Sequence, residues 1–563
     1  MPASPSPSPR GLRTDVLVIG GGLGGVACAN NAAALGMQVV LVEELDWLGG
    51  QVSAQGIPFD EHPWNETVHV SRTWSAYREA VRDFYRQRLP LTNAARQSFP
   101  LNPGHGYVST LAHDPRVSAW VLEAMLAPHI LPGRLRLFKR HRLAAAQTDG
   151  DAIRGATFAA LDGGPGLSVE ARVVVDCTET GELIALAGVE HTYGAESRAD
   201  TGELHALEAA DPLEQQGFNW AFAVDYFEGE DHTIPRPANY AFWRDWKLPY
   251  WPGPHFGMVQ LDHFTHEARQ RLLFAGDSDE EILRDMWHFR RIARRANFEP
   301  GYFPSDISMF CTMQNEYLRK PLLGLAPQEQ ADVLAEGKEQ SLSFLHWLQT
   351  EAPRHDGGTG YRGLRLRDDV FGTADGLAKQ PYTREGCRIL PEFRLLEQHV
   401  GVAARPGATG AEPFQDTIGI AAYRLNIHPT YVRHAIDIDC FPYQIPLGAL
   451  IPQRAEQLIA GNCKTVGGTR VTIGSLRHHP IDWVIGEAAG GLAAHAVRGA
   501  VPPRAVRSQP ERLQALQQDL MDRGMALRWP EFGGLPHTHA MGRSWSTLYR
   551  HAHGPITNLE TRK

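Results

Sequence analysis

The chain has 563 residues, 43% of them hydrophobic and 21% charged, so it can bury a large core, and its length suggests roughly three or four structural units. A formal charge of −9 and a pI near 6.3 lack the basic footprint of nucleic-acid binding, and no run of about 18 apolar residues predicts a membrane span. The six cysteines form no CxxC pair, which argues against a zinc knuckle or dithiol centre and favours reduced thiols in a cytoplasm.

Residues 1–13 alternate proline with small residues and are predicted to form a flexible leader. An apolar strand at residues 16–19 then suits a parallel sheet that is covered on both faces. Gly20, Gly22 and Gly25 follow in a G-x-G-x-x-G pattern and lead into a helix of small residues that ends at Gly36. The glycines would allow a tight turn, close approach of a pyrophosphate and helix packing on the strand.

Glu43 ends the next strand, 18 residues beyond Gly25, where an acidic side chain can accept hydrogen bonds from ribose hydroxyls and disfavours a 2′-phosphate. Strand, glycines, helix, strand and acid in this order predict a dinucleotide site; the alternative is a purely structural turn. A second glycine pair, Gly49 and Gly50, and then Gln51 follow directly.

The middle of the chain carries two different kinds of sequence. A strand over residues 171–176 ends in a turn, and "DGGPG" at 162–166 predicts a hairpin rather than a second nucleotide loop. Between about 200 and 415 tryptophans, prolines and histidines cluster, which predicts an inserted α+β substrate or cap domain; the alternative is that the aromatic residues fill a second core. Helices are predicted over 278–298, with acids first and arginines last, and over 339–353.

A late strand-glycine-helix segment spans residues 458–496 and would close over the cofactor. After residue 500, Ser508 and Glu511 have capping-box spacing and predict a docking helix that ends at Gly524. The predicted organisation is therefore a leader (1–13), a discontinuous dinucleotide-binding domain (14–200 and 415–500), a substrate or cap region (201–414) and a C-terminal helical tail (501–563). The fold class is α/β with a Rossmann-like domain.

The paired glycine segments resemble FAD-dependent oxidoreductases of the fumarate-reductase and glutathione-reductase-like superfamily. Segments such as "NPGHGYVSTLAHDPRVSAW", "VVVDCTETGELIALAGVEHTYGAES", "DTIGIAAYRLNIHPT" and "PYQIPLGALIP" narrow the resemblance to the xanthan-lyase-like FAD oxidoreductases, over residues 14 to 500. The resemblance implies FAD as cofactor. The residues predicted to bind it are Gly20, Gly22, Gly25, Glu43, Gly49, Gly50, Gln51, Thr178, Gly181, Gly461, Asn462 and Gly486; for the turn at Asp176 to Gly181, a structural role is equally consistent.

Catalytic candidates cluster before the late helix and in two other motifs. Arg477 and His479 match the family's "R-x-H-P" pattern, and His479 is the first choice for a base, the alternative being that it only caps the helix. Tyr423 and His428 of "AAYRLNIHP" and Arg384 of "PYTREGCR" could line the pocket, although an ion pair with Glu385 or Asp375 would explain an arginine as well. Among 25 histidines the pairs at 478, 537 and 551 lack a third ligand, so no metal is predicted.

The leading interpretation is a cytoplasmic FAD-dependent dehydrogenase or oxidase that transfers hydride between FAD and a small hydroxylated, sugar-like or carboxylated substrate. Oxygen, a quinone or a protein would serve as the electron acceptor, and neither a nucleic acid nor a membrane is expected as a partner; the oligomeric state stays open. The alternatives are an electron-transfer subunit and a flavin-bearing partner in nucleic-acid modification.

Overall fold

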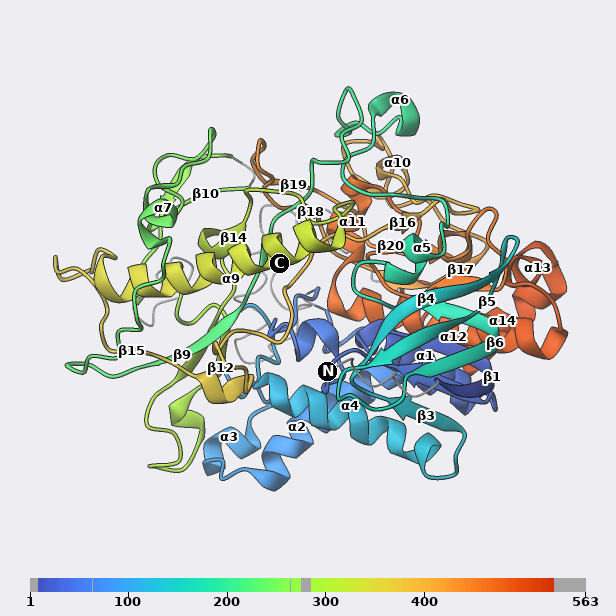
Figure 1. Cartoon of the computed structure of the whole chain (residues 1–563), viewed down its shortest axis with the longest axis horizontal. Helices are drawn as coiled ribbons and strands as arrows, with labels where there is room; N and C mark the ends of the chain where they lie inside the picture. The colour runs from blue at the N-terminus through green and yellow to red at the C-terminus, as the bar shows by residue number, and fades with distance from the viewer. Residues whose placement is uncertain (1–8, 63, 264, 275–284, 531–563) are drawn as a thin grey trace, which may run out of the picture.

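The computed structural model describes all residues except 1–8, 63, 264, 275–284 and 531–563. Its largest sheet within these residues has seven strands. Its strand order is β3-β2-β1-β6-β5-β4, and β21 pairs with β6 (Figure 1). These strands are β1 (Arg10–Ile19), β2 (Val39–Val42), β3 (Leu135–Phe138), β4 (His141–Asp149), β5 (Ala152–Ala160), β6 (Leu167–Asp176) and β21 (Leu458–Ala460).

The half of the sheet that would hold a nucleotide is parallel. Strands β3, β2, β1, β6 and β21 run the same way, whereas β5 runs antiparallel to β6, and β4 antiparallel to β5. The predicted strand at 16–19 lies at the centre of the sheet and is almost fully buried, as its uninterrupted apolar sequence requires. The "DGGPG" segment joins β5 to β6 as a hairpin, which confirms that prediction.

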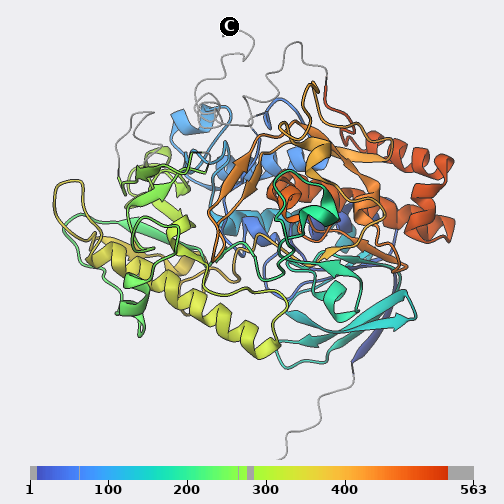
Figure 2. The same cartoon turned by 90° about the horizontal axis from the view of Figure 1, so that it is seen from above.

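Two helices from opposite ends of the sequence pack against each other beside this sheet. Helix α1 (Leu23–Ala34) and helix α12 (His479–Gly499) approach so closely that a Cβ on Gly486 would collide with the backbone of Gly24. One turn further on, a Cβ on Gly490 would collide with the carbonyl oxygen of Cys28. Small residues at these positions therefore join the N-terminal and late segments into one body (Figure 2).

The remaining helices and strands surround this sheet and build the middle region of the chain. The helices are α2 (Arg72–Arg88), α3 (Asn93–Gln97), α4 (Pro115–Ile130), α5 (Glu182–Leu186), α6 (Arg198–Thr201), α7 (Tyr240–Asp245), α9 (Pro327–Thr350), α10 (Glu397–Val400), α11 (Arg470–Leu476), α13 (Pro503–Ser508) and α14 (Pro510–Asp522). The strands are β7 (His191–Thr192), β8 (Phe218–Asn219), β9 (Phe222–Tyr226), β10 (Val259–Leu261), β11 (Ala268–Gln270), β12 (Arg291–Ala293), β13 (Ile307–Phe310), β14 (Glu316–Tyr317), β15 (Leu364–Leu366), β16 (Arg388–Ile389), β17 (Thr417–Ala421), β18 (Leu425–Ile427), β19 (Ile436–Ile438) and β20 (Tyr443–Pro446).

A second hydrophobic core occupies the aromatic-rich region. The sheet β12-β13-β9-β15 and helix α9 enclose it, and its buried members include Trp220, Trp243 and Trp347 (Figure 1). Helix α9 contains the helix predicted over 339–353 and begins earlier, at Pro327. The aromatic residues therefore serve mainly as core.

The helix predicted over 278–298 is wrong where it can be compared with the structure. Residues 275–284 lie outside the described part of the chain, and the described residues from 285 to 298 form no α-helix. Residues Arg291–Ala293 form strand β12, which pairs with β13 in antiparallel orientation. The guanidinium of Arg291 donates to the Gly104 carbonyl at 2.8 Å and pairs with Asp306 at 2.6 Å. Tertiary pairing here overrides the charge order that favoured a helix.

Both ends of the chain depart from prediction in detail. Strand β1 begins at Arg10 and pairs with β6, so residues 10–13 belong to the sheet and not to a flexible leader. The docking helix α14 begins at Pro510 with Gln509 as its N-cap, because Ser508 ends α13, and the predicted capping box of Ser508 and Glu511 does not form. Its Leu516 and Leu520 are buried.

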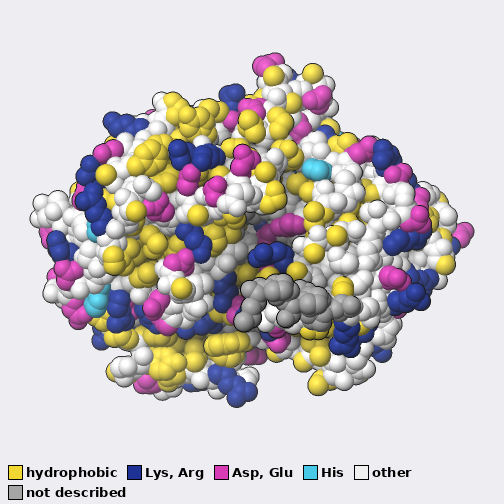
Figure 3. Space-filling model, in the orientation of Figure 1, with side chains coloured by type: hydrophobic (Ala, Val, Ile, Leu, Met, Phe, Trp, Pro, Cys, Tyr) yellow, Lys and Arg dark blue, Asp and Glu magenta, His cyan; other side chains and the backbone are white. Residues whose placement is uncertain are grey.

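The described surface carries both signs of charge. Basic and acidic side chains are interspersed over the face in Figure 3. Within the described part of the chain, none of the helices combines the length and apolarity that crossing a bilayer demands. All six cysteines are buried and free of disulfides.

Candidate functional site

The first glycine loop connects β1 to α1 with bare backbone. Gly20 has φ of +96°, and a Cβ there would collide with the Cys177 backbone, while a Cβ on Gly25 would collide with the Gly20 carbonyl. Gly22 is the N-cap of α1 and has no side chain to satisfy the first amides of the helix. The loop therefore has the bare backbone, at the N-terminus of a helix, that receives a diphosphate in this fold.

Glu43 lies directly after β2 and faces this loop. Its carboxylate accepts hydrogen bonds from the backbone N–H of Gly21 at 2.5 Å and of Leu45 at 2.8 Å. Burial raises the pKa of Glu43 to about 7, because desolvation outweighs these two hydrogen bonds. The acid stands at the end of the second parallel strand, where a ribose would be held.

The second glycine pair touches the first loop. Gly49 and Gly50 have φ of +111° and +50°, and a Cβ on Gly50 would lie 3.1 Å from the Cα of Gly22. The same Cβ would collide with a carboxylate oxygen of Glu179, which is ion-paired with Lys464. A carboxylate paired with a buried lysine thus stands beside both glycine loops, at the place where the fold would hold a diphosphate.

Gln51 joins the glycine pair to the late segment. Its Nε2 donates to the backbone carbonyl of Arg477 at 3.4 Å, although the two residues are 426 positions apart. Its Oε1 and the whole side-chain amide of Gln55 are buried without a partner. Buried polar atoms without partners are consistent with a polar ligand beside the second glycine pair.

The turn after β6 has its own internal bonds. Asp176 accepts from Thr178 N at 2.9 Å and from Thr178 Oγ1 at 2.6 Å, and Thr178 Oγ1 accepts from Glu182 N at 2.9 Å. Gly181 has φ of +80° and N-caps α5. These contacts account for the turn structurally, and the predicted cofactor contacts of Thr178 and Gly181 stay predictions.

The three remaining cofactor candidates lie around β21 and α12. A Cβ on Gly24 would collide with the carbonyl of Gly461, and Asn462 Oδ1 accepts from Lys464 N at 2.8 Å. Gly486 contacts Gly24 through helix packing. Gly461 and Asn462 therefore border the N-terminus of helix α1, while the contact of Gly486 with Gly24 is helix packing. Direct contact of these three residues with FAD stays a prediction.

His479 begins α12 and is completely buried. Its Nδ1 lies 3.0 Å from the backbone nitrogen of Asp60 and 3.3 Å from the Asp60 carbonyl oxygen, and its Nε2 has no partner among the described residues. Burial lowers the pKa of His479 to about 4. The ring is therefore neutral at neutral pH, and the role of His479 as a base stays a prediction.

Arg477 lies between the cradle and the neighbouring polar cluster. Its guanidinium donates to Tyr382 Oη at 2.7 Å and to Asn426 Oδ1 at 2.8 Å, while its backbone carbonyl receives Gln51. The residue is 2% exposed. Its contacts link the glycine loops to β18, which directly precedes His428, and to the segment that carries Arg384.

His428, Glu316 and Arg384 form a buried charged group. One Glu316 oxygen lies 2.6 Å from His428 Nδ1 and 2.8 Å from an Arg384 terminal nitrogen. A carboxylate only accepts, so the Nδ1 of His428 carries the proton and Nε2 keeps the lone pair. Burial and the charges of Arg384 and Arg477 lower the pKa of His428 well below its usual value, so the ring is neutral at pH 7.

Tyr423 forms part of the wall beside these groups. Its ring stacks on that of His478, and its backbone carbonyl accepts from Ser475 Oγ at 2.9 Å. Burial raises the pKa of the phenol, so Tyr423 stays neutral. A direct catalytic role for this residue stays a prediction.

Sequence reasoning missed several members of this region. The backbone nitrogen of Asp60 lies 3.0 Å from Nδ1 of His479, and the carboxylate of Asp60 lies 3.4 Å from the guanidinium of Arg290. Tyr382 and Asn426 hold Arg477. Tyr382 belongs to the motif "PYTREGCR" that the sequence offers as pocket lining, whereas Asn426, within "AAYRLNIHP", was not predicted. Of the two alternative carboxylates for an arginine, Glu385 lies 3.5 Å from Arg388, while Asp375 pairs with Lys338.

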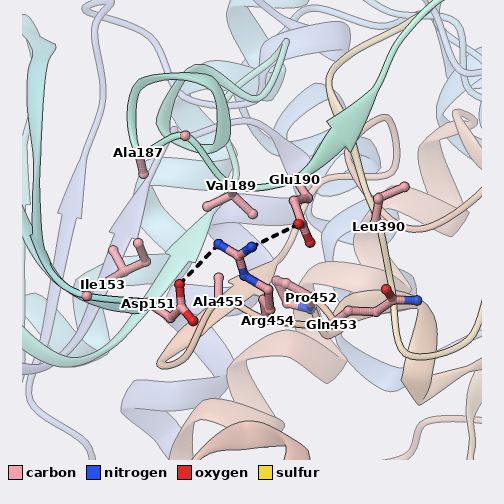
Figure 4. Close-up of a pocket in the computed structure, with 12 residues that line it drawn as sticks. Asp151, Ile153, Ala187, Val189, Glu190, Leu390, Pro452, Gln453, Arg454 and Ala455 are labelled. Atoms are coloured by element: carbon pink, nitrogen blue, oxygen red, sulfur yellow. Dashed lines mark hydrogen bonds and ion pairs between the residues drawn. The ribbon is translucent and has the colours of Figure 1, made fainter.

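A separate surface pocket of about 140 Å³ lies between β5, the segment after α5 and the segment before β21 (Figure 4). Arg454 crosses it and pairs with Asp151 at 3.2 Å and with Glu190 at 3.1 Å. None of the glycine-loop residues lines it. In the described part of the chain no group of three His, Cys, Asp or Glu could hold a metal ion, and the pairs at 537 and 551 lie outside that part.

The parallel sheet, the glycine loop and the acid after β2 define a Rossmann-type dinucleotide-binding protein. The model of the FAD dependent oxidoreductase family matches residues 15–520, and the chain belongs to this family. Its cofactor is FAD, as the family match gives it. The resemblance that the sequence motifs predicted is thereby confirmed.

Solved structures match the chain at low identity and with TM-scores below 0.5. A myxobacterial chondrochloren halogenase is 17% identical over 40% of this chain and 45% of its own, with a TM-score of 0.21. A geranylgeranyl bacteriochlorophyll reductase-like protein from Thermoplasma acidophilum is 11% identical over 92% of this chain and 85% of its own, with a TM-score of 0.33. The chain thus spans less than half the length of the halogenase. No curated protein matches the sequence.

Proposed function

We propose that the protein is an enzyme that transfers hydride between a small polar substrate and FAD, as a dehydrogenase or oxidase. The carrying observation is a pair of buried neutral histidines, His428 and His479, whose Nε2 atoms are both available to a substrate. Glu316 faces Nδ1 of His428 and leaves its Nε2 a lone pair, and Nε2 of His479 has no partner among the described residues, so we assign it as the donor. Alcohol or amine oxidation needs both a proton acceptor and a donor for developing negative charge.

Each residue of the cluster has a defined part in this proposal. FAD supplies the site that accepts or returns hydride. His428 removes the proton from the substrate's oxygen or nitrogen, and Glu316 holds its ring in the productive tautomer. His479 donates from Nε2, and Arg477, fixed by Tyr382 and Asn426, holds the substrate's polar groups.

The substrate class follows from the charges. Arg477 and Arg384 are cations beside the histidines, which supports a carboxylated or polyhydroxylated metabolite. A second dinucleotide loop is not evident in the sequence, so oxygen, a quinone or a partner protein is proposed as the electron acceptor. Six buried, unpaired thiols support the cytoplasm as the compartment.

The test is an anaerobic survey of substrates on the yellow holoprotein. Polyols, amines and hydroxy acids are added separately, and bleaching of the flavin absorbance is followed, then its return with oxygen or a quinone. Bleaching by one class, lost in the His428→Ala variant, supports the proposal. No bleaching by any class, together with fast reduction by a protein electron donor, would replace the enzyme with an electron carrier.

A further inference from the structure

Glu179 and Lys464 form an ion pair at the meeting point of the two glycine loops. Glu179 comes from the turn after β6, and Lys464 from the turn after β21. One carboxylate oxygen contacts Lys464, and the other would lie 3.0 Å from a Cβ on Gly22 and would overlap a Cβ on Gly50. The carboxylate therefore stands beside the N-terminus of α1.

The buried ammonium group of Lys464 requires an anionic partner. Its side chain is fully buried, and besides Glu179 it reaches Thr383 Oγ1 at 3.3 Å and the Thr383 carbonyl at 3.4 Å. These neutral oxygens do not compensate a buried ammonium group, so loss of the carboxylate alone would be costly. A diphosphate at the glycine loops would bring a new anion to the same place.

Glu179 also adds negative charge to an acidic surrounding. Its charge contributes to raising the pKa of Glu43 and of Asp482, each of which is raised mainly by burial. Three carboxylates thus border the loop that must receive a diphosphate. One of them, Glu179, holds a cation that the diphosphate could use.

We infer that Glu179 is a placeholder for the FAD diphosphate and that Lys464 exchanges this carboxylate for the phosphates when the cofactor binds. Glu179 keeps the flavin-free protein folded by pairing with Lys464. It weakens FAD binding by the same contact, because the pair must be broken first. Lys464 is accordingly a cofactor-binding residue.

The experiment compares Glu179→Gln and Lys464→Met in the full-length chain after removal of bound flavin. FAD affinity is measured by quenching of flavin fluorescence, thermal unfolding is measured without flavin, and inorganic pyrophosphate serves as a second probe. We expect Glu179→Gln to lower the FAD dissociation constant about tenfold and Lys464→Met to raise it about tenfold. Both variants should unfold at lower temperature without flavin, and pyrophosphate should stabilise Glu179→Gln more than the native chain.

Glu182→Gln is the matched control, since Glu182 lies three residues further on, is exposed and bonds Thr180 at 2.8 Å. It should leave the FAD affinity unchanged. An unaltered or weakened FAD affinity in Glu179→Gln would overturn the inference. If that variant does not fold without FAD, Glu179→Asp must bind FAD more tightly than the native chain, since its shorter side chain withdraws from the glycines; failure to do so overturns the inference equally.

Discussion

Asp482, in the first turn of α12, accepts a hydrogen bond at 3.2 Å from the backbone N–H of Gly24, in the first turn of α1, across 458 positions of sequence. Its other oxygen accepts from Cys463 N at 2.9 Å. The buried carboxylate of Asp482 therefore connects helix α1, the turn after β21 and helix α12, which begins with His479. The cofactor cradle and the candidate catalytic groups share this attachment.

Gly22→Val should abolish FAD retention. A side chain at the N-cap of α1 would occupy the space where the diphosphate meets bare backbone, and a Cβ alone would lie 3.0 Å from Glu179. The flavin-to-protein absorbance ratio of the purified variant measures the effect. Gly11→Val is the control, because nothing lies within 4 Å of a Cβ there. Full FAD occupancy in Gly22→Val would refute this placement of the diphosphate.

Glu43→Gln should change how the stability of the flavin-free protein depends on pH. The folded-state pKa of Glu43 is about 7 against an ordinary 4.5, so its stabilising contribution is complete below 4.5 and is lost as the pH rises through 7. The loss amounts to about 3 kcal/mol at most. The variant cannot ionise, so its free energy of unfolding relative to the native chain should increase from pH 5 to pH 8. Parallel curves from urea unfolding would contradict the buried position of this acid.

Glu316→Gln should slow substrate oxidation about a hundredfold, because His428 would lose the carboxylate that holds its proton on Nδ1. The acidic limb of the native rate profile should lie below pH 6.5, since burial and two arginines lower the pKa of His428. In the variant, kcat should fall at every pH with FAD content unchanged. Glu336→Gln, which alters a carboxylate paired with Lys320 and Arg319, is the control.

His479→Ala should keep the yellow colour and slow flavin reduction. His479→Gln should retain more of the rate, because its amide N–H can reach the position of the imidazole Nε2. Stopped-flow absorbance gives both rates. Equal loss in the two variants would favour a base over a donor, and an unchanged rate in both would remove His479 from the reaction.

Gly486→Ala should lower the free energy of unfolding by about 1–3 kcal/mol or more, because its Cβ would meet the backbone of Gly24, which cannot move aside. Gly410→Ala, where a Cβ meets nothing within 4 Å, should have little effect. Urea unfolding of the two flavin-free variants makes the comparison. A stable Gly486→Ala chain would show that α1 and α12 can separate slightly without cost.

Local sequence was informative where a pattern has one physical meaning. The pattern of glycines after an apolar strand, with an acid after the next strand, predicts a dinucleotide-binding turn between two parallel strands. The structure has this form, with Gly20, Gly22 and Gly25 after β1 and Glu43 after β2. The same reasoning failed at residues 291–293, because pairing with β13 outweighs the helical charge order. It failed again at Ser508, where Pro510 moved the helix start.

The sequence by itself determined the dinucleotide fold, because strand, glycine turn, helix and acid are read from neighbouring residues whose backbone requirements are local. Only the tertiary structure decided which groups face the two histidines and which anion faces Lys464. Those properties depend on Asp60 beside His479, Glu316 beside His428 and Glu179 beside Lys464, pairs separated by 419, 112 and 285 positions. Hydrogen bonding and ion pairing depend on distance in space, and distance along the chain carries no record of it.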